Sequence, residues 1–342
     1  MARLLITGGA GFIGSHTCVV LLQAGHELVV IDNFHNSCPE ACRRVERLTG
    51  RTLVLEQADV RDGPRLNSVF DRHGRFDGVI HFAGLKAVGE SVKEPLLYWH
   101  VNVCGSRTLL QAMAAHGCRT LVFSSSATLY GNPDSNPIAE TAPIRPVNPY
   151  GQSKAAVERM SRDVAESQPG CKGWRLACLR YFNPVGAHPS GEIGEAPQGI
   201  PDNLFPFISQ VAMGERSSLD VFGGDWPTPD GSGVRDYIHV MDLAAGHCVT
   251  LEHLLDGQPQ LLTLNLGSGC GTSVLQALAA FERVVGRSIP HRIVARRPGD
   301  VAMTVADPGR AAAVLGWQTE RTLAEMCADG WHWQQRNPLG FG

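Results

Sequence analysis

Short apolar runs alternate with longer amphipathic stretches along the first half of the chain. The short runs predict strands at Arg3–Thr7, Leu28–Asp32, Thr52–Leu55, Gly78–Phe82, Thr120–Ser124 and Trp174–Tyr181. The longer stretches predict helices at Phe12–Ala24, Pro39–Leu48, Pro64–Asp71, Pro95–Ala115 and Tyr150–Ser167. This alternation is typical of an α/β protein in which helices cover a doubly wound parallel sheet.

The pattern changes after about residue 182, where Pro- and Gly-rich segments separate the predicted elements. The segments "NPVGAHPSGEIGEAPQGIPDN" and "GGDWPTPDGSGVRDY" contain Asn, Arg and aromatic residues, which favours ordered binding loops. A helix at Val274–Val285 and a strand at Ile293–Ala295 are predicted beyond them. We therefore expect a doubly wound domain over residues 1–182. Residues 183–342 should mainly form a smaller, loop-rich α/β lobe, with some segments returning to the first domain.

Composition and charge narrow the class of protein. The 342 residues carry a formal net charge of −3, with 43% hydrophobic and 18% charged residues, so no strong field would gather nucleic acid or anionic lipid. The ten cysteines form no Cys-x-x-Cys pair and no Cys/His cluster, which argues against a metal site and a disulfide framework. Glycines interrupt the N-terminal segment, and no apolar run reaches about 18 residues. We expect a cytoplasmic protein without a membrane or nucleic-acid partner.

A glycine-rich turn follows the first predicted strand. In "LLITGGAGFIGSH", Gly8, Gly11 and Gly14 lead from that strand into an apolar helix. Such a turn lets the backbone approach a pyrophosphate, and it directs the N–H groups of the helix N-terminus toward the negative charge. Asp32 ends the second strand, where a carboxylate accepts hydrogen bonds from the adenosine ribose and repels a 2′-phosphate. The first domain is therefore predicted to be of the Rossmann type and to bind NAD rather than NADP.

Two further strand ends carry candidate cofactor contacts. Asp59 in "QADVRD" could accept from the adenine amino group or could instead cap a helix. The small residues of "HFAGLKAVGES" would let a cofactor lie against the backbone of Phe82, Ala83 and Gly84. The chain has only four lysines, and one of them, Lys86, is predicted to point toward the cleft rather than into solvent.

The predicted chemical centre combines a strand end with the helix that follows. "FSSSATLYG" places Ser126 at the end of the fifth strand, and "NPYGQSK" places Tyr150 and Lys154 one helical turn apart. A phenol must have its pKa lowered to act as a base near neutral pH, and the Lys154 ammonium and a positive nicotinamide would both do so. Such a pair is common by chance, but the glycine turn and the strand-end serine favour a catalytic role over an ordinary surface pair.

These motifs resemble the extended short-chain dehydrogenase/reductase superfamily, and the blocks "FAGLKAVGES", "LRYFNPVGAH", "GIPDNLFPF" and "GSGVRDYIHVMDLA" are similar to the UDP-glucose 4-epimerase family. The resemblance implies tightly held NAD, removal of the sugar 4-hydroxyl proton by Tyr150, a 4-keto intermediate that turns over, and return of hydride to its other face. Phe12 stands where Tyr is common. The dinucleotide would contact Gly8, Gly11, Phe12, Ile13, Gly14, Asp32, Asn33, Asn36, Ser37, Asp59, Val60, Phe82, Ala83, Gly84, Lys86, Asn102, Ser124, Tyr150, Lys154 and Tyr181.

The resemblance also gives the Pro- and Gly-rich loops roles in binding a UDP-hexose. The substrate would contact Lys86, Ser126, Tyr150, Asn183, Asn203, Leu204, Val221, Phe222, Arg235, Tyr237, Arg297, Asp300 and Thr304. Ordinary alternatives are a core position for Phe222, solvated charges for the arginines and a turn residue at Asn183. Asp202 stands where a second Asn is common. Thr304 matches a position where a bulky Tyr closes the sugar pocket in some relatives, so its small side chain predicts activity on UDP-GlcNAc and UDP-GalNAc as well.

Other functions remain open from the sequence. A nucleotide-sugar 4,6-dehydratase would share the hydride step, but it commonly has Asp-Glu directly after the hydroxyl residue, whereas Ser126 is followed by "ATLY". An epimerase of other nucleotide sugars is also compatible, and a non-catalytic NAD sensor is disfavoured because Tyr150 and Lys154 are present. The resemblance further implies a homodimer formed through the helices at Pro95–Ala115 and Tyr150–Ser167.

Overall fold

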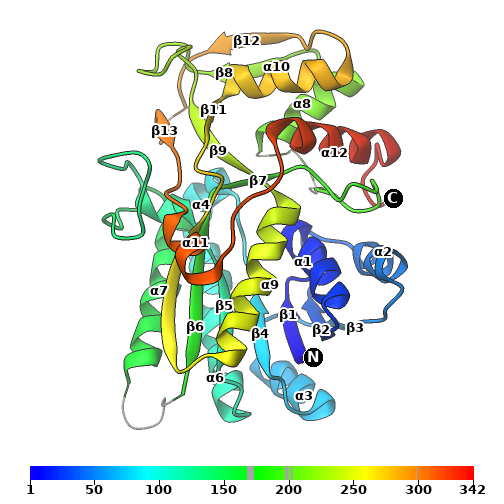
Figure 1. Ribbon diagram of the computed structural model, residues 1–342, viewed down its shortest axis with the longest axis vertical. Coiled ribbons are helices and arrows are strands. Elements are labelled where there is room, and N and C mark those ends of the chain that lie inside the picture. The colour runs from blue at the N-terminus through cyan, green and yellow to red at the C-terminus, as the bar shows by residue number, and fades with distance from the viewer. Residues whose placement is uncertain (168–172, 197–198, 200, 202, 298) are drawn as a thin grey trace.

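A seven-stranded parallel sheet forms the centre of the molecule (Figure 1). The structure, a computed structural model, describes residues 1–167, 173–196, 199, 201, 203–297 and 299–342. The strand order is β10-β6-β5-β4-β1-β2-β3. The strands are β1 (Arg3–Thr7), β2 (Glu27–Asp32), β3 (Val54–Gln57), β4 (Gly78–His81), β5 (Thr120–Ser126), β6 (Arg175–Tyr181) and β10 (Gln260–Leu266). The predicted doubly wound α/β fold is confirmed, and the order reverses between β1 and β4, the point at which such sheets bind ligands.

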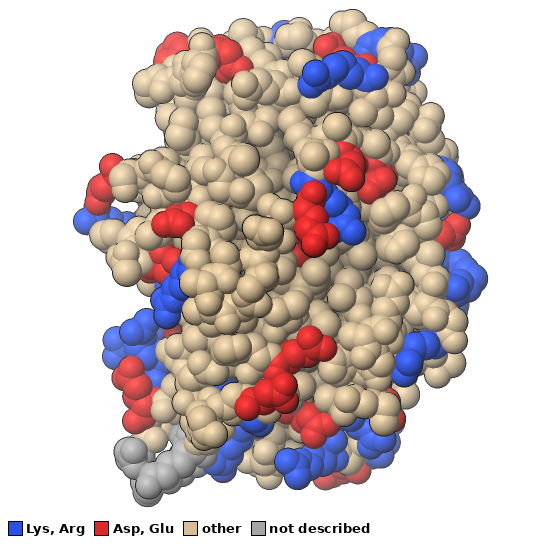
Figure 2. Space-filling view, in the orientation of Figure 1, with Lys and Arg blue, Asp and Glu red and all other residues tan. Residues whose placement is uncertain are grey.

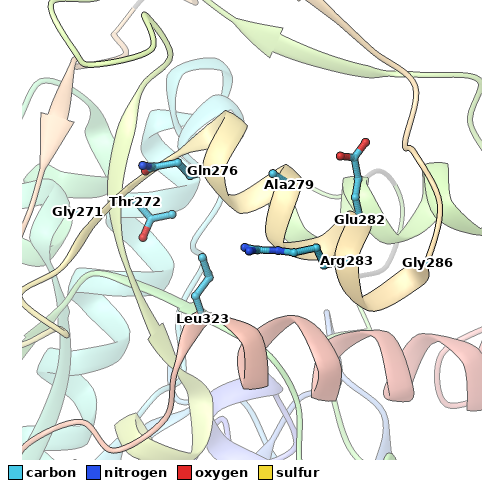
Figure 3. A pocket seen from close by; sticks show the side chains of 8 residues that line it. All are labelled: Gly271, Thr272, Gln276, Ala279, Glu282, Arg283, Gly286 and Leu323. Atoms are coloured by element: carbon cyan, nitrogen blue, oxygen red, sulfur yellow. The ribbon is translucent and has the colours of Figure 1, made fainter.

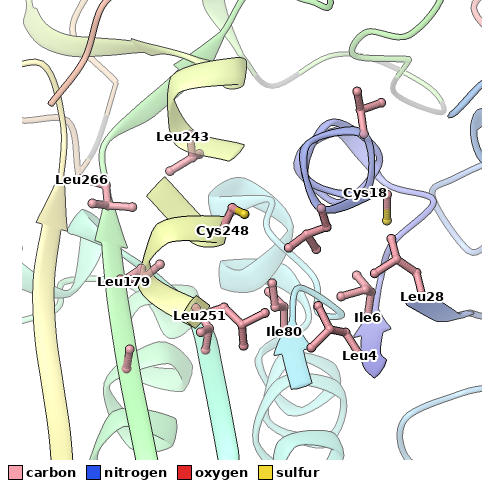
Figure 4. Close-up of a cluster of buried hydrophobic side chains, with 14 of the residues drawn as sticks. Leu4, Ile6, Cys18, Leu28, Ile80, Leu179, Leu243, Cys248, Leu251 and Leu266 are labelled. Atoms are coloured by element: carbon pink, nitrogen blue, oxygen red, sulfur yellow. The ribbon is translucent and has the colours of Figure 1, made fainter. Parts of the chain in front are cut away.

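Helices cover both faces of this sheet. The first face carries α1 (Phe12–Gln23), α2 (Pro39–Thr49), α9 (Val240–Asp256) and α11 (Gly309–Leu315). The second carries α3 (Gly63–His73), α6 (Gly105–Ala115) and α7 (Pro149–Glu166). Figure 4 shows the core on the first face, where Leu4 and Ile6 of β1 belong to the same apolar cluster as Leu243 and Leu251 of α9. Because both faces are covered, the central strands are apolar on both sides, which explains their continuous hydrophobic runs.

One predicted helix has a different local structure. The stretch predicted as a single α-helix from Pro95 to Ala115 contains α5 (Pro95–Tyr98), the π-helix η1 (Trp99–Cys104) and α6. A π-turn shifts the apolar spacing by one residue only, so hydrophobic periodicity does not reveal it, and such turns occur frequently at functional sites. The short helix α4 (Val88–Lys93) precedes α5 and was not predicted.

A smaller lobe lies beyond the carboxyl ends of the central strands. Its four-stranded sheet contains β7 (Asn183–Val185), β9 (Val234–His239), β11 (Gly271–Ser273) and β13 (Met303–Thr304). The strands β8 (Leu219–Phe222) and β12 (His291–Val294) pair separately, and β12 covers most of the predicted Ile293–Ala295 strand. The helices α8 (Leu204–Met213), α10 (Val274–Val285) and α12 (Leu323–Arg336) share one apolar cluster. The segments α9, β10 and α11 return to the central sheet, although they follow residue 182.

Basic and acidic side chains are interspersed on the face shown in Figure 2, with broad neutral areas between them. This distribution agrees with the small net charge of −3. Among the helices in the described part of the chain, none combines the length and apolar character needed to cross a membrane.

Candidate active site

The glycine turn between β1 and α1 forms a tightly packed cradle. A Cβ atom at Gly8 would lie 2.6 Å from the Ala83 nitrogen, and one at Gly14 would lie 2.3 Å from the Gly8 oxygen. Gly8 also has a φ of +70°, which L side chains rarely adopt. Gly11 is the N-cap of α1 and no side chain caps this helix, so its first N–H groups point into the turn. The turn can therefore bind a pyrophosphate through backbone N–H groups.

The Asp32 carboxylate is fixed at the end of β2, beside the glycine turn. It accepts hydrogen bonds from the Ala10 nitrogen at 3.0 Å, the Phe34 nitrogen at 3.0 Å and the Ser37 hydroxyl at 2.7 Å. Only 7% of the residue is exposed. Asn36 lies in the same loop as Ser37. The position suits the adenosine ribose of a dinucleotide, as the sequence predicts.

Asp59 follows β3 and is not the helix cap that the sequence allowed. Asp62 caps α3 instead, since its side chain accepts from the Arg65 nitrogen. Hydrogen bonds from the Arg61 guanidinium lower the pKa of Asp59, and Asn33 also donates to its carboxylate at 2.9 Å. The neighbouring Val60 is buried. The Asp59–Asn33 pair therefore lies next to Asp32 along the carboxyl edge of the sheet.

The end of β4 approaches the same turn closely. Phe82 and Ala83 donate backbone hydrogen bonds to the Thr7 oxygen at the end of β1. A Cβ atom at Gly84 would lie 3.0 Å from Asn102 Oδ1 and 3.9 Å from Lys154 Nζ. Asn102, in the π-helix η1, also donates to the Ser153 hydroxyl of α7 at 2.9 Å. Strand β4 is thereby connected to the helix that carries Tyr150.

The predicted catalytic residues lie together at the end of β5. Tyr150 opens α7, whose N-terminus is capped by Asn148 through a 2.8 Å hydrogen bond from the Gly151 nitrogen. Ser126 lies close enough to the Tyr150 phenol to lower its pKa. The Lys154 ammonium donates to the Ser124 oxygen at 2.8 Å and lies 5.8 Å from the centroid of the Tyr150 ring. One helix start and one strand end thus bring Ser126, Tyr150 and Lys154 together.

Tyr181 of β6 completes the wall beside these residues. Its hydroxyl hydrogen-bonds to the Ser124 hydroxyl. Burial raises the pKa of Tyr181, and a negative charge on Tyr150 would raise it further. The two phenols are therefore close enough for their charges to interact.

The electrostatic environment of Tyr150 differs from the expectation. Burial raises its pKa above the ordinary value of 10.0, while the Ser126 hydroxyl and the ammonium of Lys86 act in the opposite direction. The sequence predicted that Lys154 lowers the pKa of the phenol, but Lys86 is the lysine that does so here. Lys154 itself is 5% exposed, and burial lowers its pKa to about 8, with Glu158 opposing.

We expect this difference to be measurable in an ultraviolet titration of the phenol. Wild-type protein minus Tyr150→Phe should report an apparent pKa above 10.0 without dinucleotide, because burial disfavours the phenolate. Adding NAD⁺ should lower that pKa, because a nearby positive charge favours the anion. A value below 10.0 without dinucleotide would contradict the dominance of burial.

The predicted nucleotide contacts lie in the smaller lobe. Arg297 pairs with Asp300, with 3.1 Å from Nε to Oδ2, and its guanidinium carbon lies 4.5 Å from the centroid of the Phe222 ring. Phe222 is only partly buried, so its ring is not a core residue. Burial lowers the pKa of Arg235, and Asp300 and Arg297 are both close enough to affect it. The two arginines, Asp300 and Phe222 thus form one group.

The other predicted substrate residues surround this group. Thr304 of β13 is the register partner of Arg235 in β9, and Asn183 of β7 donates to the Asp236 oxygen at 3.0 Å. Val221 and Tyr237 are buried in β8 and β9, which leaves them in packing positions. Leu204 is the first residue of α8. Asp202 lies outside the described residues.

Phe12 and Ile13 occupy the first turn of α1. The Phe12 ring packs edge to face against His16, with 5.2 Å between ring centroids. Ile13 is partly buried against the core. Their proximity to the glycine turn agrees with a cofactor contact, although neither side chain presents a polar atom.

The sequence did not predict two groups of residues next to the site. Glu158, one turn after Lys154, accepts from Ser125 at 2.5 Å and from Arg180 Nη2 at 2.6 Å. Glu195 accepts from Lys86 Nζ and from Asn203 Nδ2, each at 2.8 Å. The four-residue spacing between Lys154 and Glu158 could have identified Glu158 from the sequence. No sequence pattern identifies Glu195, because its loop lacks periodicity.

Two features lie outside this site. A shallow hollow between β11, α10 and the start of α12 is shown in Figure 3; it is lined by Gly271, Thr272, Gln276, Ala279, Glu282, Arg283, Gly286 and Leu323, none of them predicted site residues. In the described part of the chain, His26, Cys248 and Glu252 bring possible metal ligands within 4.8 Å of one another. Burial raises the pKa of the Cys248 thiol to about 12, which disfavours the thiolate that binds metals.

Similarity to known proteins agrees with this geometry. The NAD dependent epimerase/dehydratase family matches residues 4–267. A UDP-glucose 4-epimerase of Mus musculus is 53% identical, with the alignment covering 100% of this chain and 99% of the relative. The solved UDP-glucose 4-epimerase of Stenotrophomonas maltophilia, with bound NAD and formylated UDP-arabinopyranose, is 49% identical with a TM-score of 0.95, over 99% of each chain.

A second solved structure, the UDP-glucose 4-epimerase of Bifidobacterium longum in complex with NAD⁺ and UDP, is 47% identical with a TM-score of 0.94, again over 99% of each chain. These similarities extend over both the central sheet and the smaller lobe. The chain therefore belongs to the NAD dependent epimerase/dehydratase family and, within it, to the UDP-glucose 4-epimerases.

Proposed function

We propose that this chain interconverts UDP-glucose and UDP-galactose through a 4-keto intermediate, with Ser126, Tyr150 and Lys154 as its catalytic residues. The observation that carries the proposal is the grouping at the end of β5, where Ser126 lies close enough to the Tyr150 phenol to lower its pKa and Lys154 follows one helical turn later. These groups lie beside the glycine turn, at the point where the strand order reverses. A proton acceptor next to a dinucleotide site suits oxidation of a sugar hydroxyl.

The residues at the carboxyl edge of the sheet fit NAD. The side-chain-free cradle at Gly8 and Gly14 would receive the pyrophosphate, and Asp32 would receive the adenosine ribose. The Asp32 carboxylate would also repel the 2′-phosphate of NADP. Bound NAD supplies a hydride acceptor that later returns the hydride, so no net oxidation results. The Lys154 ammonium would bind the hydroxyls of the nicotinamide ribose.

Tyr150 moves the proton in this scheme. As the phenolate it takes the proton from the sugar 4-hydroxyl, and as the phenol it returns the proton to the ketone oxygen. Ser126, which is close enough to Tyr150 to lower the pKa of the phenol, would share that proton or stabilise the oxyanion. Because Tyr150 is buried, both transfers take place away from bulk water.

The smaller lobe would hold the UDP group. Arg235 and Arg297 suit the diphosphate, because guanidinium groups bind phosphate oxygens in a bidentate manner. Asp300 would accept from the uridine ribose, and the exposed part of the Phe222 ring would contact uracil. This arrangement fixes UDP by charge and leaves the hexose to fewer contacts, which suits a sugar that must present each face in turn.

A coupled assay of purified protein with UDP-glucose and UDP-galactose, without added NAD, tests the proposal. We expect conversion in both directions and transient absorbance of reduced nicotinamide on addition of substrate. A sensor without chemistry would give no reduced nicotinamide. A 4,6-dehydratase would release a 6-deoxy-4-keto sugar, and the absence of an acid in the segment Ala127–Tyr130 after Ser126 argues against it. A preference for other nucleotide sugars would appear in the same assay.

We infer that UDP-GlcNAc and UDP-GalNAc are also substrates. Thr304 has a small side chain, and it lies in β13 beside Arg235, close to the proposed diphosphate contacts. A small side chain there would leave room for a 2-acetamido group.

Thr304→Tyr should therefore reduce kcat/KM for the N-acetyl pair by about 10- to 200-fold, because it would fill space that the acetamido group needs. Activity on UDP-glucose should change far less. Thr304→Ser is the matched control, since it keeps the small size and the hydroxyl. Equal losses on both pairs would contradict a specificity role, and wild-type protein without N-acetyl activity would refute the inference.

A homodimer is proposed on the basis of an apolar surface beside α7. Val92, Leu96 and Trp99 are exposed on α4, α5 and η1, with Leu96 82% exposed. An apolar strip of this kind on adjoining helices is typical of a protein–protein interface. Light scattering on purified protein should give twice the chain mass, and Leu96→Glu should shift the protein toward the monomer.

We further propose that residues 1–182 form an NAD-binding domain, and that residues 183–342 mainly bind the UDP-sugar while α9, β10 and α11 complete the first domain. The membership of β10 in the central sheet supports this division. A cytoplasmic location is proposed from the composition, and fractionation of the host cell would test it.

A further inference from the structure

Glu195 holds two residues of the proposed UDP-sugar site at one oxygen atom. Lys86 Nζ and Asn203 Nδ2 each lie 2.8 Å from Glu195 Oε1. Lys86 follows β4 of the central sheet, whereas Asn203 directly precedes α8 of the smaller lobe. The carboxylate therefore connects the two lobes at the site itself.

The loop that carries Glu195 is firmly attached to the rest of the protein. Trp333 of α12 donates from Nε1 to the backbone carbonyl oxygen of Glu195 at 3.1 Å. A Cβ atom at Gly194 would lie 2.3 Å from the Trp333 ring, so only glycine allows this close approach. Ile193 is fully buried. Figure 1 shows this segment, after β7, running alongside α12. Glu195 is thus a fixed acceptor, and the residues that bind it are positioned by it.

Asn203 is held by Glu195 rather than by its own helix. It is the N-cap of α8, a position at which an Asn side chain usually accepts from the first-turn N–H groups. Its side chain makes no such capping bond, and its amide donates to Glu195 instead. Among the described residues, Glu195 is the one hydrogen-bond partner of this amide, whose second N–H and carbonyl oxygen could contact a ligand.

Lys86 is also held by Glu195, and it lies partly in solvent and partly toward Tyr150. Its side chain is 50% exposed, while the Glu195 side chain is 10% exposed. The Lys86 ammonium is close enough to Tyr150 to lower the pKa of that phenol. An ammonium has three N–H groups, so Lys86 can bind Glu195 and a substrate oxygen at once. A half-exposed lysine without an anchor would sample many rotamers.

We propose that Glu195 is a positioning residue of the epimerase site, which holds Lys86 toward the sugar and Tyr150 and holds Asn203 toward the nucleotide. This inference rests on the proposed assignment of Lys86 and Asn203 to the UDP-sugar site. The carboxylate fixes both donors before substrate arrives, so that their ordering does not have to accompany binding. It also links the two ends of the UDP-sugar through a single side chain.

Glu195→Ala should raise KM for UDP-glucose about tenfold, because two donors lose a charged partner. The acid limb of the pH profile of kcat/KM should also move to higher pH, since Lys86 is no longer held near Tyr150. In the described part of the chain, the other titratable groups near Tyr150 are Lys154, Tyr181 and Tyr98, and the substitution leaves all three in place. Glu195→Gln keeps an acceptor oxygen, so its KM should stay close to the wild-type value.

Glu192→Ala is the matched control. Glu192 lies in the same loop and carries the same charge, but it pairs with Arg336 at 2.6 Å on the side facing α12. We expect wild-type KM and a wild-type pH profile for this variant. A loss equal to that of Glu195→Ala would mean that the loop matters only for structure, and would overturn the proposal.

The double variant Glu195→Ala/Lys86→Met separates positioning from a general charge effect. If Glu195 acts partly through Lys86, the pH shift of the double variant should equal that of Lys86→Met alone. The role of Glu195 is overturned if the pH shifts of the two single variants add fully in the double variant, or if Glu195→Ala has an unchanged KM. Calorimetric titration of Lys86→Met and Asn203→Ala with UDP-glucose tests the assignment of the site separately. Unchanged affinity in both would refute that assignment, whereas weakened affinity with a wild-type Glu195→Ala would refute the positioning role alone.

Discussion

Replacing Tyr150 with Phe is expected to reduce kcat for UDP-glucose by about a hundred- to ten-thousand-fold, the range typical of removing a positioned general base. The ring remains, so its edge-to-face contact with Tyr98, at 6.4 Å between centroids, should be retained. The loss would therefore report the missing hydroxyl rather than a repacked core. Stopped-flow absorbance of reduced nicotinamide should show that the hydride step itself becomes slow.

Tyr130→Phe is the matched control for this experiment. Tyr130 is also buried, and its hydroxyl donates to Asn265 at 2.7 Å and accepts from Arg180 at 3.0 Å. We expect this variant to lower the thermal stability while the hydride step stays fast. If Tyr150→Phe retains more than about a tenth of wild-type kcat, another group removes the proton and the proposed mechanism is wrong.

Replacing Arg180 with Met is expected to have the largest effect on stability, about 3–5 kcal/mol in the free energy of unfolding. The Arg180 and Glu158 side chains are 3% and 6% exposed, and their closest atoms are 2.6 Å apart. The substitution would leave the Glu158 carboxylate buried without its main counter-charge, with Ser125 as its remaining hydrogen-bond partner among the described residues. Urea unfolding followed by circular dichroism would measure the change.

The double variant Arg180→Met/Glu158→Leu shows whether the cost comes from the unpaired charge. Replacing both partners with apolar side chains removes the buried carboxylate, so most of the lost stability should return. If the double variant is no more stable than Arg180→Met, packing rather than charge explains the loss. Because Glu158 lies on α7 one turn from Lys154, the single variant should also weaken hydride transfer.

The first half of the fold could be predicted closely from the sequence. Each predicted strand through Trp174–Tyr181 has a counterpart in β1 to β6, because strands buried on both faces leave continuous apolar runs. The glycine turn and Asp32 could also be identified from the sequence. Gly8 and Gly14 stand where any side chain would collide with backbone. The turn therefore requires glycine at these positions, and the glycines mark it in the sequence.

The smaller lobe was much less predictable. Its strands β7, β11 and β13 have two or three residues each, which is too short for a periodic signal. β9 pairs with β7, β11 and β13, strands that are distant in the sequence. The membership of β10 in the central sheet follows from its pairing with β6, and no local pattern indicates a partner strand.

The candidate site likewise has a part that the sequence predicts and a part that it does not. Tyr150 and Lys154 were recognisable because a four-residue spacing places two side chains on one helical face. The influence of Lys86 on Tyr150 was not, since the two residues meet only when the end of β4 and the start of α7 come together. The direction of the Tyr150 pKa shift was also beyond sequence reasoning, because burial is a property of the folded state.

By itself, then, the sequence determined the doubly wound fold, the dinucleotide turn and the choice of Tyr150 as the proposed base, because each depends on contacts within a few residues or on a residue type that local sterics demand. The tertiary structure decided which lysine acts on the Tyr150 phenol, which carboxylate holds Lys86 and Asn203, and how Arg180 neutralises Glu158. Those pairs join residues that are remote along the chain. Their distances, and therefore their electrostatic effects, exist only once the strands and loops have packed.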